Sequence, residues 1–188
     1  MAITRLTAPS ITGLTIPNTS INNASLDSVT ALPSGITTGK ILQVVQAVDK
    51  NSGSFQLATD TLSTMMTVNI TPSSTSSKVL VRFDVYLGTA DSANYPYVVL
   101  RRNGSDIYRA NTAGSRKNST GGTGYVDGNK LQCLSNEFLD SPSSTSQVAY
   151  TLNVGGYNNL VFYKNIPNDN NTQQATACSQ ITVMEIAT

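Results

Sequence analysis

Apolar and polar residues alternate strictly in two segments of the chain, a pattern typical of β-strands with one buried face. The apolar positions are Val79, Val81, Phe83, Val85 and Leu87 in the first segment, and Val148, Tyr150, Leu152 and Val154 in the second. Runs rich in β-branched and aromatic residues predict further strands at residues 41–48, 65–70, 97–102, 107–110, 131–139, 160–163 and 179–186. Turn-forming Gly, Asn, Asp and Pro residues separate these runs, and no stretch of ten residues has a helical period. We therefore expect an all-β fold over residues 40–188, an antiparallel β-sandwich of jelly-roll type.

Residues 1–39 follow neither a strand nor a helix period. Aliphatic residues recur there every two to five positions among Ser, Thr, Asn, Pro and Gly, and the only charged residues are Arg5 and Asp27. The segment is too apolar for a free linker and too irregular for a helix. We expect an extended N-terminal attachment arm that buries its aliphatic residues against another chain, with a disordered tail as the alternative. The expected anchors are Leu14, Ile16, Leu26 and Val29.

The composition argues against several classes of function. Charged residues make up only 12% of the chain and the net charge is +1, so we expect neither a nucleic acid nor a membrane as a partner. The sequence contains no His, the commonest general base and metal ligand, so we expect no enzyme, no metal and no cofactor. Residues 1–9 lack the layout of a signal peptide, and no apolar run reaches the roughly 18 residues of a membrane helix. We expect synthesis in the cytoplasm.

Two cysteines, Cys133 and Cys178, are too few for a disulfide framework or for a zinc site without histidines. Both fall in or next to predicted strands. We expect them to be reduced and buried.

Carboxylates are the remaining candidates for catalysis, because a pair of them can hydrolyse a glycosidic bond. Glu137, Asp140 and Glu185 fall near strand ends, but no aromatic groove accompanies them in the sequence. A glycan-depolymerising enzyme is therefore a remote alternative. We expect structural roles, with Asp140 starting a turn and Glu185 pairing with Arg82 or Arg102.

Two predicted loops carry exposed tyrosines next to amides and hydroxyls. Tyr95 and Tyr97 flank Pro96, and the polar loop of residues 115–128 contains Tyr125. Such side chains can stack on sugars or contact another protein. Alternatively, these tyrosines cover the edges of the sandwich or line an oligomer axis.

Three parts of the sequence resemble a group of small virion proteins from tailed bacteriophages, particularly phages of cyanobacteria and other marine bacteria. They are KILQVVQA (residues 40–47), TPSSTSSKVLV (residues 71–81), and the pair FLDSPSSTSQVAY (residues 138–150) and SQITVMEI (residues 179–186). The resemblance implies a jelly-roll head similar to that of C1q and tumour necrosis factor. It also implies a homotrimer, mounted on a fibre or on the capsid of a virion that assembles in the host cytoplasm.

These observations lead to one expectation and one alternative. We expect a non-enzymatic structural protein of a phage virion, a trimeric short fibre whose arm docks onto other virion proteins and whose head recognises the host surface. The alternative is a capsid decoration protein that clamps capsomers.

Overall fold

The computed structural model describes residues 40–89, 95–123, 130–156, 159, 161–168, 170 and 172–187. The predicted arm, with Leu14, Ile16, Leu26 and Val29, lies outside the described residues, and so does Tyr125. The described part is the segment for which the sequence predicts a sandwich.

Strands alone make up the regular structure of the described residues, and none of these residues forms a helix that could cross a membrane. The strands are β1 (Ile41–Asp49), β2 (Gly53–Gln56), β3 (Leu62–Ile70), β4 (Lys78–Thr89), β5 (Tyr97–Arg102), β6 (Ser105–Tyr108), β7 (Gly121–Gly122), β8 (Gln132–Asp140), β9 (Val148–Gly155), β10 (Val161–Lys164) and β11 (Ser179–Ile186).

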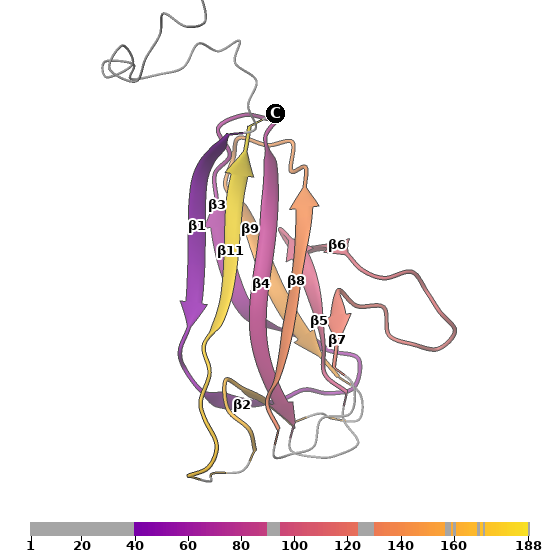
Figure 1. Ribbon diagram of the computed structural model, residues 1–188. Coiled ribbons are helices and arrows are strands. Elements are labelled where there is room, and N and C mark those ends of the chain that lie inside the picture. The colour runs from indigo at the N-terminus through magenta and orange to yellow at the C-terminus, as the bar shows by residue number, and fades with distance from the viewer. Residues whose placement is uncertain are drawn as a thin grey trace, which may run out of the picture. The chain divides into compact units, whose positions relative to one another are not determined.

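The strands form two antiparallel sheets that pack face to face. One sheet has the order β1-β11-β4-β10-β2, and β8 pairs with the other edge of β4. The second sheet has the order β3-β9-β5-β6, and β7 also pairs with β5. Figure 1 shows β1, β11, β4 and β8 in the front layer and β3, β9 and β5 behind them. The predicted all-β antiparallel sandwich is confirmed.

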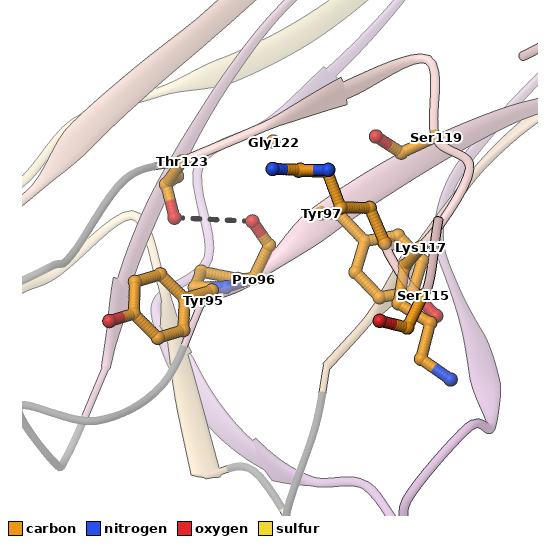
Figure 2. Close-up of a pocket in the computed structure, with 9 residues that line it drawn as sticks. Tyr95, Pro96, Tyr97, Ser115, Lys117, Ser119, Gly122 and Thr123 are labelled. Atoms are coloured by element: carbon orange, nitrogen blue, oxygen red, sulfur yellow. Dashed lines mark hydrogen bonds between the residues drawn. The ribbon is translucent and has the colours of Figure 1, made fainter. Parts of the chain in front are cut away.

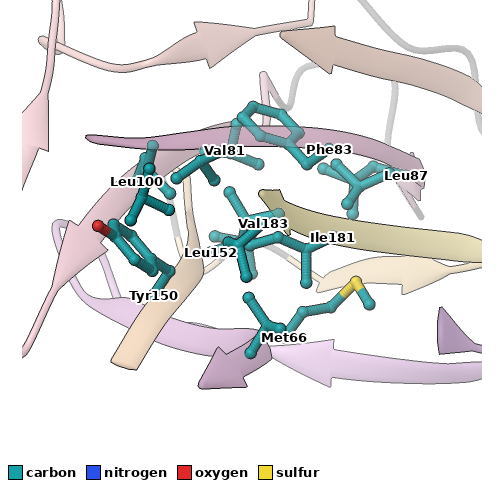
Figure 3. Packing of buried hydrophobic residues seen from close by; sticks show 14 of the residues in the cluster. Met66, Val81, Phe83, Leu87, Leu100, Tyr150, Leu152, Ile181 and Val183 are labelled. Atoms are coloured by element: carbon teal, nitrogen blue, oxygen red, sulfur yellow. The ribbon is translucent and has the colours of Figure 1, made fainter. Parts of the chain in front are cut away.

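Side-chain alternation decides what fills the space between the sheets. The five apolar residues of β4 and the four of β9 named above are at most 1% exposed. Figure 3 shows side chains from both layers meeting, with Phe83 and Val183 from one sheet and Leu152 from the other. Burying each such side chain stabilises the fold by about 1.5–3 kcal/mol relative to leaving it in water.

The chain enters the sandwich at one end. Ala187 N donates a hydrogen bond to Lys40 O at 2.9 Å, and Ile41 pairs with Ile186 at the end of β11. The last residues of β3 reach the same end, because Gln43 Nε2 donates to Thr71 O at 2.7 Å.

The start of β3 marks the opposite end. Leu62 pairs with Gly155, the last residue of β9, and Gly155 pairs with Tyr97, the first residue of β5. A strand of nine residues such as β3 spans roughly 26 Å at about 3.3 Å per residue. Tyr97 therefore lies about one strand length from the point where the chain enters.

The sequence pattern does not predict β2 or β7. Both are short, and β7 consists of two glycines that have no side chains to show a period. The strand predicted at residues 107–110 lies instead at Ser105–Tyr108, because Asn103 and Gly104 make a tight turn with φ of +49° and +82°.

Candidate functional site

An open cavity of about 830 Å³ lies between the start of β5 and the connection that leads into β7. In Figure 2, Tyr95, Pro96 and Thr123 lie at the left, and Tyr97, Ser115, Lys117 and Ser119 lie at the right. The described residues that line it are Tyr95, Pro96, Tyr97, Ser115, Arg116, Lys117, Ser119, Gly122 and Thr123.

Hydrogen bonds from backbone and threonine hydroxyl groups join the segments on either side of this cavity. Thr123 N donates to Pro96 O at 2.9 Å, and the Thr123 hydroxyl donates to the same oxygen at 3.1 Å. Thr120 N donates to Val98 O at 2.8 Å, and the Thr120 hydroxyl accepts a bond from Leu100 N at 2.8 Å. Because Val98 and Leu100 belong to the core, the floor of the cavity is anchored to the sandwich.

The two tyrosines differ in how firmly they are held. Tyr97 is half-buried and lies against Gly155, where an added Cβ would come within 2.6 Å of its Cζ atom. Tyr95 is 52% exposed at the rim. The cavity therefore combines one ring fixed by packing with one ring open to solvent.

Two cations line the cavity, and none of its described lining residues is acidic. Lys117 forms an ion pair with Asp60, which lies outside the lining. Arg116 Nη1 donates to Ala113 O at 3.2 Å within a turn in which Gly114 has φ of +66°. No described carboxylate forms an ion pair with the Arg116 guanidinium.

The structure brings Tyr95 and Tyr97 together with the first part of the predicted 115–128 loop. Their role in recognition stays a prediction, and Tyr125 lies outside the described residues. Arg116 and Lys117 were missed by the sequence reasoning. The signal that could have found them is their place among Ser and Gly residues in a chain with few charges.

The three candidate carboxylates do not form a common site. Glu137 is exposed on the outer face of β8, whereas Asp140 is 6% exposed and Glu185 fully buried. The side chain of Asp140 was expected to start a turn, but the structure shows it bound to two other side chains. It accepts hydrogen bonds from Arg102 Nη1 at 2.8 and 2.9 Å and from the Tyr150 hydroxyl at 2.7 Å.

Glu185 does not pair with an arginine, contrary to expectation. Its carboxylate accepts bonds from Ser73 N at 2.7 Å, Ser73 Oγ at 2.6 Å and Gln43 Nε2 at 2.6 Å. Burial alone would raise the pKa of Glu185, but the hydrogen bonds from Ser73, Gln43 and Ser77 outweigh it and lower the pKa to about 2. This carboxylate ties the connection between β3 and β4 to β1 and β11.

The prediction that the cysteines are buried is wrong. Cys133 and Cys178 are both exposed, and neither is in a disulfide. Cys133 shares the outward face of β8 with Ser135 and Glu137, while Leu134 and Phe138 point to the core. Strand phase therefore decides its position, rather than the general preference of thiols for the interior.

A second notable surface crosses the outer face of the six-stranded sheet. Four apolar residues lie in register on four adjacent strands, and we call them the outer apolar row: Val44, Met184, Leu80 and Leu139. Val44 is 56% exposed and Leu139 is 46% exposed. The next outward row is polar and contains Arg82 opposite Glu137. Exposed apolar residues aligned across neighbouring strands are a common feature of interaction surfaces.

No group of three or more His, Cys, Asp or Glu side chains that could hold a metal ion occurs among the residues that the structure describes.

No protein-family model matches the sequence, and no curated protein is similar to it. Among solved structures, the chain is similar to infectious bursal disease virus, Gt strain, with 9% identity over 83% of this chain and 43% of that chain, at a TM-score of 0.45. The Gx strain matches with 11% identity over 77% of this chain and 40% of that chain, at a TM-score of 0.42. A VP2 subviral particle of the same virus matches with 11% identity over 77% and 39%, at a TM-score of 0.39. The chain spans less than half the length of these chains.

Proposed function

We propose that the chain is a non-enzymatic structural protein of a phage virion, a trimeric short fibre. Residues 1–39 anchor it to other virion proteins, and the sandwich is exposed for recognition of the host surface. The resemblance of residues 40–47, 71–81, 138–150 and 179–186 to small phage virion proteins supports the virion role.

One structural observation supports the fibre role most directly. The chain enters the sandwich beside Ala187, whereas the cavity of Tyr95 and Tyr97 lies toward the opposite end, about one strand length away. A protein that is attached through the segment before Lys40 would hold this cavity away from its attachment point. That arrangement suits a part that must meet a surface outside the particle.

The outer apolar row supports self-association. Val44 and Leu139 are exposed, and the adjacent polar row carries one cation, Arg82, and one anion, Glu137. A face that carries both signs can bind a different face of a second copy, which is the head-to-tail contact that a closed trimer requires. We propose that a second copy of this chain covers the row in the oligomer.

The abundance of the protein in purified virions tests the fibre role. A stained gel should show tens of copies per particle. An abundance that approaches that of the major capsid protein would contradict the fibre role and favour capsid decoration, and absence from the particle would contradict both.

Deletion of residues 1–36 tests the anchoring role of the arm. We expect a soluble trimer that melts cooperatively but no longer enters virions. The full chain, produced in the same way, is the control for incorporation. Normal incorporation of the deleted protein would mean that the attachment surface lies on the sandwich itself.

A further inference from the structure

The lining of the Tyr95 cavity indicates the chemical class of its ligand. It offers two aromatic rings, hydroxyl groups from Ser115, Ser119 and Thr123, and two cations, with no acidic side chain among the described lining residues. Rings and hydroxyls suit a polyhydroxylated molecule that has both apolar and polar faces. The cations favour a ligand with a negative charge.

The two tyrosines can act together on such a ligand. Tyr97 is fixed by its contact with Gly155, while Tyr95, two residues earlier, has 52% of its surface exposed at the rim. Pro96 between them restricts the backbone that carries both rings. A flat ligand therefore meets a ring that is already in place, which reduces the loss of conformational freedom on binding.

Of the two cations, Arg116 is the better partner for a negatively charged ligand. Lys117 already forms an ion pair with Asp60, whereas no ion pair joins Arg116 to a carboxylate of the described part of the chain. The one hydrogen bond recorded for its guanidinium uses Nη1. The planar fork of an arginine matches a carboxylate, which it binds through two parallel hydrogen bonds.

We infer that this cavity binds a carboxylated saccharide, such as a uronic acid unit of a surface polysaccharide. The sugar ring lies against Tyr95 and Tyr97, and its carboxylate pairs with Arg116. A nucleic acid fits less well, because it needs a track of cations along its phosphates, and this chain has a net charge of only +1. The inference rests on the proposed role in host-surface recognition and names the ligand class for it.

Calorimetric titration of the full chain tests this inference. The probes are hexagalacturonate, the neutral hexasaccharide maltohexaose, and a thymidine hexanucleotide. We expect hexagalacturonate to bind at least about tenfold more tightly than either of the others, which corresponds to about 1.4 kcal/mol. Equal binding of maltohexaose would overturn the role of the carboxylate. Equal or tighter binding of the oligonucleotide would overturn the ligand class in favour of a general affinity for polyanions. No binding of hexagalacturonate would also overturn the ligand class.

Three variants assign the binding to the cavity. Arg116→Gln should reduce the affinity for hexagalacturonate at least about tenfold and abolish the preference over maltohexaose. Tyr95→Ala should weaken binding of both saccharides. Lys50→Gln removes an exposed cation that lies outside the cavity lining and is the matched control, with affinity unchanged. All three side chains are substantially exposed, so melting temperatures should stay close to that of the parent chain. An Arg116→Gln protein that folds and binds like the parent would refute the assignment.

These titrations are separable from the test of the virion role. A protein found at fibre abundance in virions that does not bind hexagalacturonate would have another ligand and the same function. A protein that binds the acidic saccharide but is absent from virions would keep its ligand and lose the fibre role.

Discussion

At Gly155, a single hydrogen atom in place of a side chain determines where a tyrosine ring can lie. A Cβ at this position would meet Tyr97 Cζ at 2.6 Å and Leu62 Cδ2 at 2.7 Å, both well inside van der Waals contact. The glycine is needed here for close approach across paired strands rather than for an unusual backbone angle. One side of the Tyr95 cavity is thus set by a residue that does not line it.

Substitution of Gly155 tests whether the position of Tyr97 depends on this glycine. We expect Gly155→Ala to lower the free energy of unfolding by about 1 kcal/mol, because the outer ends of the Tyr97 and Leu62 side chains must both move. Gly53→Ala is the matched control, since an added Cβ there meets nothing within 4 Å. Urea unfolding of both variants gives the comparison, and a Gly155→Ala protein as stable as Gly53→Ala would contradict the close contact.

A second prediction about a single residue concerns Glu185 and the dependence of stability on pH. Its pKa in the folded protein, about 2, is below the ordinary value of 4.5. A lowered pKa stabilises the fold fully above the ordinary value, and the stabilisation is lost as the pH falls toward the folded value. The parent chain should therefore lose stability between these two pH values, by up to a few kcal/mol from this group.

The variant Glu185→Gln isolates this contribution. At neutral pH it should be less stable by about 1–3 kcal/mol, because an amide cannot accept every bond that the carboxylate accepts from Ser73 and Gln43. Its unfolding free energy should fall less steeply with acid than that of the parent. Asp84, whose pKa is also lowered by bonds from Ser135 and Gln180, contributes equally to both proteins. Parallel curves for the two proteins would mean that Glu185 is not the group that titrates.

Among the elements, the strands with an unbroken apolar face were the easiest to predict from the sequence. In β4 and β9 each inward position is apolar, so a period of two is visible without knowledge of the partners. β8 is harder, because its inward face includes Asn136, whose Nδ2 donates to Thr120 O at 3.2 Å. The polar inward residue hides the phase that would have placed Cys133 outside.

The candidate site was predictable only in part, because one of its two sides depends on pairing between distant segments. Tyr95 and Tyr97 are conspicuous because aromatic residues make up only 6% of the chain. The loop that faces them is brought to them by β7, whose two glycines pair with Tyr97 and Val98. Pairing across more than twenty residues depends on tertiary contacts, which no local pattern contains.

One hydrogen-bonded group joins the two sheets. Asp140 ends β8 of the six-stranded sheet, and it binds Arg102 at the end of β5 and Tyr150 of β9, both in the other sheet. Burial and the bond to Asp140 raise the pKa of Tyr150 above its ordinary value. The tyrosine therefore remains a hydrogen-bond donor at all ordinary pH values.

We expect the two partners of Asp140 to contribute unequally to stability. Tyr150→Phe removes one bond and should cost about 1–2 kcal/mol. Arg102→Gln should cost more, because it leaves a carboxylate that is 6% exposed without its counterion. Unfolding in urea measures both variants. Arg101→Gln, whose parent side chain pairs with Asp106 near the surface, is the control and should change stability by less than about 1 kcal/mol.

At the scale of the whole molecule, the outer apolar row predicts self-association. Light scattering of the parent chain should report about three chains per particle. The double variant Val44→Ser, Leu139→Ser should weaken association by about 2–3 kcal/mol per interface, because both side chains are exposed in the single chain and would be buried in the oligomer.

Tyr95→Ser is the matched control, since Tyr95 is also an exposed large apolar residue but lies in the cavity and not in the row. It should leave the particle mass unchanged. A monomeric parent chain at micromolar concentration would contradict the proposed oligomer. A double variant that associates like the parent would mean that another face carries the contact.

The two sides of the Tyr95 cavity differ in how closely they are tied to the hydrophobic core. This difference has consequences for evolution and for engineering. Tyr97 belongs to β5, whose neighbouring residues fill the core, whereas residues 111–117 on the facing side are all exposed. During evolution, the sequence of residues 111–117 can change without disturbing the hydrophobic core. Chains that share this frame should thus diverge first at residues 111–117, and a library randomised there would sample new specificities on an unchanged scaffold.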